Sequence, residues 1–259
     1  MIRALEEAQM KIARVVFVVA GALAATHASG QAAPCPCPPP PATPPLWSGE
    51  VGVSYIATSG NTSTSSFGGN FGLKWLPDPW ALEAKFAFLR SESEHVVTAE
   101  AYDGSLTAAR SLTKRLDVYG GSEYHRNVFA GIDYRINATA GAGYKVLDGP
   151  VTFLRPEIGF GYEKRKLVDV GTDSYPVGRA GLKFLWKFSA GGEFANETSF
   201  TDDLNETDNW VFRNKATVSA KLTNVFQLRL GWGIEYNNLP APGFGKTDTV
   251  TSAAIVAKF

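Results

Sequence analysis

The chain has little cysteine, methionine or histidine, and its charges cancel. Its 259 residues include two Cys, two Met and three His, and 25 basic residues balance 25 acidic ones. A chain without net charge has no overall attraction for nucleic acid or another polyanion. The few cysteines and histidines do not cluster with enough further ligands to form a metal centre. We therefore predict no nucleic-acid partner, no metal and no cofactor.

Long apolar runs are also missing beyond residue 30, so no later segment reaches the about 20 apolar residues that a membrane helix requires. The apolar run 15–25 follows two basic residues and precedes small ones, which is the pattern of a secretory signal peptide. We predict a signal peptide over residues 1–28. Because Glu6 and Glu7 are unusual in such a start, we expect translation from Met10. A short membrane anchor is the alternative, and the run is too short to span a bilayer.

Residues 29–46 are rich in proline, which suits neither a helix nor a central strand. We expect an extended periplasmic leader. It contains both cysteines, Cys35 and Cys37, and each follows a proline, where a lipoprotein cleavage site requires a small residue. In an oxidising periplasm the thiols could pair with another molecule or with each other. We favour a solvated tail without chemistry.

Glycine and aromatic residues are abundant, with 26 Gly, 16 Phe, 9 Tyr and 6 Trp, as is typical of β proteins. From Trp47 onward apolar and polar residues alternate in successive segments, which predicts strands with two different faces. We expect about twelve antiparallel strands, with ten to fourteen as the range. The expected strands are 47–57, 67–75, 80–88, 100–111, 116–126, 132–146, 151–164, 175–186, 188–196, 210–222, 226–236 and 249–259.

The connections and the aromatic residues favour a membrane barrel. Every second connection is short, and the others are mostly longer and more polar, as in barrels with periplasmic turns and external loops. Aromatic residues gather near both ends of the strands, at the levels of two membrane interfaces. A soluble sandwich or lipocalin-like barrel is the alternative, and its core would have to hold all these rings. We predict an all-β transmembrane barrel of the bacterial outer membrane over residues 47–259, in contact with outer-membrane lipids.

The chain stops on Phe259, at the end of a strand. A soluble domain has little reason to end so, whereas a barrel closes its sheet with the last strand and anchors an aromatic ring at the interface. This ending resembles the terminal signal that the barrel-assembly machinery reads. We therefore expect Phe259 to act in assembly, with both termini in the periplasm.

The inward face carries both signs of charge, with more basic than acidic residues. Three functions follow from this face: a narrow pore for small, preferably anionic solutes, a closed structural barrel with a salt-bridged lumen, and an enzyme. We favour the pore, because a basic wall with few matching acids would not form a fully paired plug. The expected lumen residues are Arg179, Lys183, Arg213, Lys215, Lys221, Arg229, Glu157, Glu193 and Glu235.

Catalysis is the least favoured of the three. Only His95 and His125 remain after signal cleavage, and His95 lies in an acidic external loop. His125 stands near Glu123 on an inward face, and such a pair could orient a general base. Asn127 stands where outer-membrane phospholipases have the serine of a His-x-Ser arrangement. We expect these side chains to pack the lumen and predict no enzyme activity.

Several segments resemble a known family. They are the first external turn, Thr58-Ser59-Gly60-Asn61-Thr62, and the segments 141–144, 157–163, 236–240 and 246–248. Together they are similar to the family of salt-induced outer membrane proteins, also called domain of unknown function 481, over residues 47–259. The resemblance implies an outer-membrane barrel and brings no catalytic residues or substrate. The residues of the Ser-Gly-Asn turn suit a tight turn, so we expect a structural role for it ahead of ligand binding.

Overall fold

The computed structural model describes residues 46–59, 64–93 and 96–259. They belong to one compact unit, Pro44–Phe259. The predicted signal peptide, the leader with Cys35 and Cys37, and Gly60, Asn61 and Thr62 of the predicted turn lie outside the described residues. Within them, no helix is long and apolar enough to cross a membrane.

Twelve long antiparallel strands form the fold, as predicted, together with the two-residue strand β7. The strands are β1 (Trp47–Ser59), β2 (Thr64–Trp75), β3 (Trp80–Ser93), β4 (Val96–Ser111), β5 (Leu116–Asn127), β6 (Ile132–Tyr144), β7 (Leu147–Asp148), β8 (Thr152–Leu167), β9 (Gly171–Trp186), β10 (Gly192–Asp203), β11 (Trp210–Lys221), β12 (Phe226–Asn237) and β13 (Thr247–Lys258). A short 3-10 helix, η1 (Val128–Ala130), joins β5 to β6.

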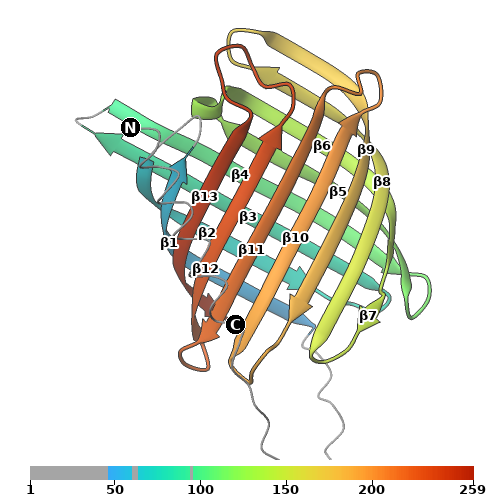
Figure 1. Ribbon diagram of the computed structural model, residues 1–259. Helices are drawn as coiled ribbons and strands as arrows, with labels where there is room; N and C mark the ends of the chain where they lie inside the picture. The colour runs from blue at the N-terminus through green and yellow to red at the C-terminus, as the bar shows by residue number, and fades with distance from the viewer. Residues whose placement is uncertain (1–45, 60–63, 94–95) are drawn as a thin grey trace, which may run out of the picture. The chain divides into compact units, whose positions relative to one another are not determined.

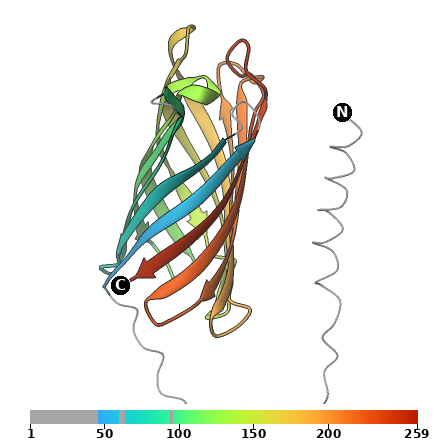
Figure 2. The same ribbon diagram turned by 90° about the vertical axis from the view of Figure 1, so that its left-hand side faces the viewer.

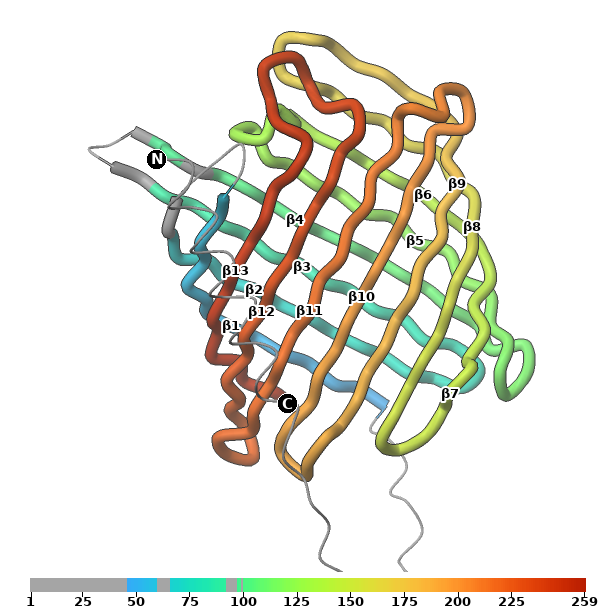
Figure 3. Tube along the Cα trace, viewed as in Figure 1, coloured from blue at the N-terminus to red at the C-terminus, as the bar shows by residue number. Residues whose placement is uncertain are grey.

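The sheet closes on itself at two seams. Neighbouring strands follow the chain order, β13 pairs with β1, and β6 pairs with β8 past the small strand β7. The β1–β13 register runs from Glu50 opposite Lys258 to Ser59 opposite Thr249. Figures 1 and 3 show the resulting barrel, and Figure 2 shows the tilt of its strands. Closure leaves the sheet without a free edge, so the long strands satisfy each other's backbone groups.

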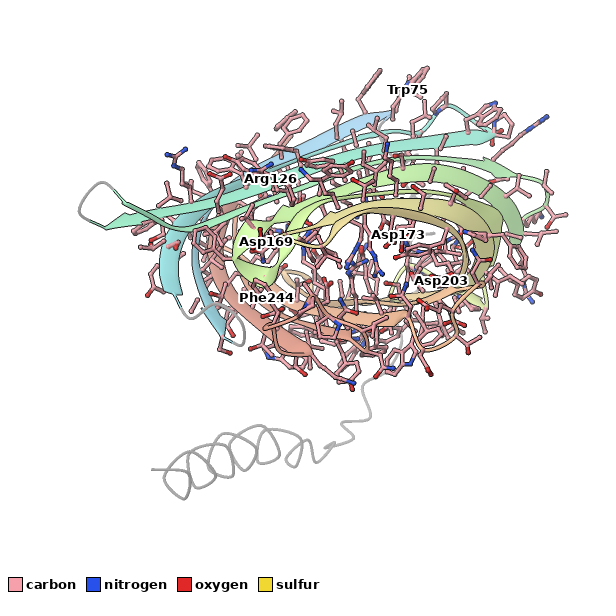
Figure 4. All side chains as sticks on the ribbon, turned by 90° about the horizontal axis from the view of Figure 1, so that it is seen from above. Trp75, Arg126, Asp169, Asp173, Asp203 and Phe244 are labelled. Carbon is pink, nitrogen blue, oxygen red and sulfur yellow. The ribbon has the colours of Figure 1, made fainter. Side chains whose placement is uncertain are left out.

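The two faces of the strands differ as the alternation predicts. On β1, Val51, Val53 and Tyr55 point outward and are exposed, whereas Gly52 and Ser54 point inward and are buried. Outward-facing aliphatic and aromatic side chains recur on the other strands, and charged side chains project into the interior (Figure 4). An apolar exterior around a polar interior is the inverse of a soluble barrel and suits a barrel surrounded by lipid.

Aromatic side chains mark both ends of the barrel. At the end with the short turns, Trp47 stacks on Trp75 with ring centroids 5.1 Å apart. At the other end, Trp210 stacks on Tyr236 at 5.1 Å. Both pairs lie on neighbouring strands, which brings their rings side by side. The two expected aromatic levels are therefore present. We call the first end the short-turn rim and the second the long-loop rim.

The long-loop rim differs from the sequence prediction, because several strands continue into segments expected to be loops. The segment 166–174 was expected to be a loop, yet β8 and β9 extend until only 168–170 connect them. The strand expected at 188–196 begins and ends later, as β10, and so includes Glu197. The polar residues that suggested loops continue to alternate, and they can do so because one face of each strand lines a polar interior.

The loop between β12 and β13, residues 238–246, reaches across the long-loop rim, and we call it the capping loop. Its Ala241 is buried with Ile132 of β6 and Leu167 of β8, and Phe244 packs against them. A Cβ atom at Gly131, where φ is +81°, would lie 2.9 Å from the Phe244 ring, so this close approach requires glycine. The strands β6 and β8 are far from β12 in the order of the barrel wall. The capping loop therefore covers part of this mouth.

The C-terminal ring provides a first test of the fold. Gly49 and Phe259 exchange backbone hydrogen bonds of 2.7 and 2.9 Å, and a Cβ atom at Gly49 would overlap the Phe259 ring. We expect Gly49→Val to lower the free energy of unfolding by about 1–3 kcal/mol through this overlap. The measurement is the urea midpoint of the barrel in detergent, followed by heat-modifiable gel mobility.

The matched control is Gly104→Val. Gly104 is a strand glycine whose added Cβ atom would meet nothing closer than the Tyr124 Cβ, at 3.9 Å. This variant should keep the parent midpoint. Equal midpoints for both variants would contradict the packing of Phe259 on Gly49.

Candidate functional site: the barrel lumen

The strand register places most of the charged residues of the long strands inside the barrel. On β11, Trp210 and Phe212 pair with outward residues of β10 and β12, so Arg213 and Lys215 point into the lumen. The same alternation directs Glu235 of β12 inward. Charges that face one another across a closed barrel must either pair or contact water. The geometry shows both outcomes, in different parts of the lumen.

An ion-pair network crosses the lumen toward the long-loop rim. The carboxylate of Glu235 accepts a hydrogen bond of 2.9 Å from Nε of Arg213, on the adjacent strand. It also accepts one of 3.0 Å from Nη1 of Arg135, on β6 at the far side of the wall. Arg135 lies 3.3 Å from Glu163, which accepts a hydrogen bond of 2.7 Å from the hydroxyl of Tyr175. Two arginines and two glutamates thus connect opposite walls.

A second buried cluster lines the wall formed by β5, β6 and β8. Arg155 donates hydrogen bonds to both carboxylate oxygens of Asp117, one of them 3.0 Å long, and it also pairs with Glu157. All three side chains are buried. A Cβ atom at Gly143 would overlap the guanidinium group of Arg155, so the cluster fits against the wall only because that position is glycine.

A third link spans the middle of the lumen. Lys85 of β3 lies 3.3 Å from Glu197 of β10, a strand on the other side of the barrel. Lys85 also lies 3.4 Å from Glu83 on its own strand. Lys183 of β9 approaches Glu157 to 3.7 Å. Unlike the first two clusters, these lysines remain substantially exposed within the lumen.

The predicted lumen residues face the interior, but the expected excess of unmatched basic groups is wrong. Arg213 pairs with Glu235 and Lys183 with Glu157, as described above. The remaining partners are Glu123 for Arg179 at 2.8 Å, Glu50 for Arg229 at 2.8 Å, and Lys258 for Glu193 at 3.3 Å. Among the described residues, Lys215 and Lys221 alone of the predicted set form no ion pair within 4.0 Å. Most of the supposed basic wall is therefore neutralised by carboxylates from other strands.

The sequence prediction also missed two acidic residues that face the lumen. Glu197 was assigned to an external loop and lies on β10, where it meets Lys85. Asp103 lies on β4, whose alternation was faint, and Nδ1 of His125 is 2.7 Å from its carboxylate. The suggested pairing of His125 with Glu123 is wrong, since Glu123 binds Arg179. Continuing the alternation of the expected strand 188–196 by one residue would have placed Glu197 inside, on the same face as Glu193.

The other predicted positions lie at the rims. Thr58 and Ser59 end β1, where the Ser59 hydroxyl is hydrogen-bonded to the Thr249 hydroxyl of β13. These residues therefore belong to the seam that closes the barrel, which suits a structural role. Phe259 packs over Gly49 at the short-turn rim, at the other end of the same seam.

Exposure separates a filled from a hydrated region of the lumen. The side chains of Arg135 and Glu163 are 2% and 5% exposed, whereas those of Lys85 and Glu197 are 44% and 53% exposed. Asp103, also inward-facing, is 62% exposed. The wall of β6 and β8 is thus covered by packed charges. Space for water remains beside β3, β4 and β10.

Comparison with known protein sequences places these features in a family. The family described as "Protein of unknown function, DUF481" matches residues 51–259. The chain is also similar to "Uncharacterized protein YdiY" of Escherichia coli (strain K12). The two are 23% identical over 194 residues, which are 74% of this chain and 75% of that protein.

Solved structures share the fold. One similar structure is the NanC porin, with a TM-score of 0.56 and 10% identity over 81% of this chain and 100% of that one. Another is the COG4313 outer membrane channel from Pseudomonas putida F1, with a TM-score of 0.52 and 14% identity over 84% of this chain and 97% of that one. At these identities the likeness establishes the barrel fold alone.

The ion-pair network that crosses the lumen predicts that Glu235 stabilises the barrel. Replacing it by Gln removes the carboxylate between Arg213 and Arg135 and leaves a buried guanidinium undercompensated. We expect Glu235→Gln to lower the free energy of unfolding by about 3 kcal/mol, measured as the shift of the urea midpoint. Adding Arg135→Gln should restore part of the loss.

Glu206→Gln serves as the control, because Glu206 is exposed in the connection between β10 and β11. It should leave the midpoint unchanged. If Glu235→Gln were as stable as Glu206→Gln, the network would contribute nothing to the barrel.

Proposed function

We propose that this chain, which belongs to the DUF481 family, forms a narrow channel of the bacterial outer membrane for small polar solutes, with a preference for anions. The apolar exterior between two aromatic levels supports placement in a bilayer. The similar structures, a porin and an outer membrane channel, agree with it.

One observation carries the conduction proposal: inward-facing charges in the middle of the barrel keep contact with solvent. Lys85 and Glu197 come from opposite walls and meet at a single contact of 3.3 Å, yet both remain about half exposed. Charges that filled the lumen as a plug would be buried, as Arg135 and Glu163 are. A hydrated space therefore runs beside the packed wall.

The anion preference rests on which charges face that space. In the middle of the lumen, Lys85 and Glu197 are both exposed, and Lys215 is exposed without an ion pair. Toward the short-turn rim, the exposed side chains are those of Lys74 and Lys258. Their partners Glu83 and Glu193 are 23% and 28% exposed and lie closer to the wall. A solute in this half would meet more ammonium groups than carboxylates, and these groups attract anions.

The orientation and the assembly of the barrel belong to the same proposal. We place the short-turn rim, with Trp47 and Phe259, in the periplasm, because β1 starts and β13 ends at this rim and barrels of the outer membrane have their short turns on the periplasmic side. Phe259 would then stand at the inner interface, where the barrel-assembly machinery could bind it. Outer-membrane lipids would cover the apolar exterior.

A barrel that does not conduct is the second candidate, and specific contacts favour it. The Arg135–Glu235 pair connects opposite walls near the long-loop rim, and the capping loop covers part of that mouth. Together these contacts could close the passage to everything larger than water. The two candidates share one structure and differ in whether ions pass.

Conductance in planar bilayers distinguishes the channel from the closed barrel, and Lys215 is the residue to replace. Lys215 forms no ion pair within 4.0 Å among the described residues, so its replacement breaks no direct contact, although Glu197 lies opposite it in the β10–β11 register. We expect anion-selective channels. Lys215→Glu should lower the anion-to-cation permeability ratio by about fivefold, since unit charges about 4 Å apart in a water-like medium interact by roughly 1 kcal/mol.

The control is Lys164→Gln, a lysine on the outer face of β8 near the long-loop rim. It should keep the parent permeability ratio. Folded protein that gives no channels would favour the closed barrel. Channels whose anion-to-cation permeability ratio is unchanged by Lys215→Glu would contradict the anion preference assigned to this wall.

A further inference from the structure

A cavity of about 280 Å³ opens at the short-turn rim. It lies between the connection 187–191, which joins β9 to β10, and the connection 222–225, which joins β11 to β12. Backbone hydrogen bonds hold its frame: Lys221 N donates to Gly191 O at 2.7 Å, and Lys258 N donates to Val225 O at 2.8 Å. The cavity is therefore built from strand ends and tight turns that hold one another in place.

The charged side chains that line the cavity are mostly basic. Lys187, Lys221 and Lys258 are three basic lining residues, and Glu193 is the one acidic lining residue. Glu193 lies 3.3 Å from Nζ of Lys258. Lys187 and Lys221 have no ion pair within the described part of the chain. Two of the residues that line the cavity thus carry a positive charge without an ion-pair partner.

A buried amide provides a second, independent sign of a ligand. Gln227 lines the cavity and is 7% exposed, and its Nε2 has no hydrogen-bond partner among the described residues. A buried N–H donor without an acceptor is unfavourable and is seldom left so. A turn of the amide toward the cavity would let an oxygen acceptor of a ligand satisfy it. Gln227 and the two lysines without an ion pair line the same small space.

We propose that this cavity is a binding site for a small oxyanion, of which phosphate is the simplest example. The site offers ammonium and amide donors, and charge-assisted hydrogen bonds from such donors favour phosphate or carboxylate oxygens. Its volume lies just below the range of about 300–1,000 Å³ for sites that hold drug-sized ligands. At the mouth of the proposed channel the site would concentrate anions. In that role it rests on the proposed function, although binding itself needs no conduction.

Titration calorimetry with inorganic phosphate, at low ionic strength in a phosphate-free non-ionic detergent, tests the site on the full barrel. We expect saturable binding of one phosphate. Lys187→Gln with Lys221→Gln should weaken it by about tenfold, because the two uncompensated charges are lost. Gln227→Leu, which removes the amide alone, should weaken it less.

Lys114→Gln is the matched control. Lys114 is an exposed lysine of another connection at the same rim, 112–115, and lies outside the cavity. This variant should bind phosphate as the parent does, and heat-modifiable gel mobility confirms that each variant is folded. No saturable binding by the folded parent would overturn the site. An equal loss in Lys114→Gln would also overturn it, because the binding would then reflect rim charge in general.

The phosphate group could belong to a free oxyanion or to a lipid headgroup, and a second experiment distinguishes the two. The titration is repeated in nanodiscs of phosphatidylethanolamine and in nanodiscs of an uncharged glycolipid. Equal affinity in both supports a free oxyanion as the ligand. Binding that is weak in phosphatidylethanolamine and restored in glycolipid supports a lipid headgroup in the same site. If the protein conducts but does not bind phosphate, the proposed binding site is overturned and the proposed channel is not. If the protein binds phosphate but does not conduct, the proposed channel is overturned and the binding site is not.

Discussion

The closure of the sheet is the constraint on which the rest of the structure depends. A strand edge left open in an apolar surrounding would leave backbone N–H and C=O groups without partners, at a cost of several kcal/mol each. The β1–β13 and β6–β8 pairings remove both edges. Closure also fixes an inside and an outside, so each residue of a long strand faces one or the other. Phe259 lies at one end of the first seam and Ser59 at the other, which explains why both belong to contacts between the first and last strands.

Closure also brings together charges that are far apart in sequence. Arg135 and Glu235 are 100 residues apart and form a hydrogen bond across the lumen. Arg229 and Glu50 are 179 residues apart and form two hydrogen bonds of 2.8 Å near the first seam. Packed pairs on the β6–β8 wall and solvated lysines on the facing wall together produce an asymmetric lumen. This asymmetry connects the fold with the proposed channel, because a solute would pass along one wall only.

The sequence predicts the barrel, the number of long strands, the two aromatic levels and the inward face of every proposed lumen residue. Alternation reports which face a side chain occupies, and it does so for Arg213 and Lys215. It does not report height along the axis or the neighbour across the lumen, since both depend on strand register and tilt. Alternation therefore could not predict the pairings of Arg179 with Glu123 and of Lys85 with Glu197. The late end of β10 was missed because Glu197 and the polar residues after it look like a loop, although every second one faces a polar interior.

The central claim is that water and ions pass beside Lys215, and covalent block of single channels tests it most directly. Lys215→Cys is made in a chain whose Cys35 and Cys37 are replaced by serine, and a negatively charged methanethiosulfonate reagent is added during recording. The account predicts an abrupt fall in anion current as the introduced thiol reacts. The matched variant Asn214→Cys, whose side chain faces outward on the same strand, should keep its current. An unchanged current after confirmed modification at position 215, or an equal fall at position 214, would contradict it.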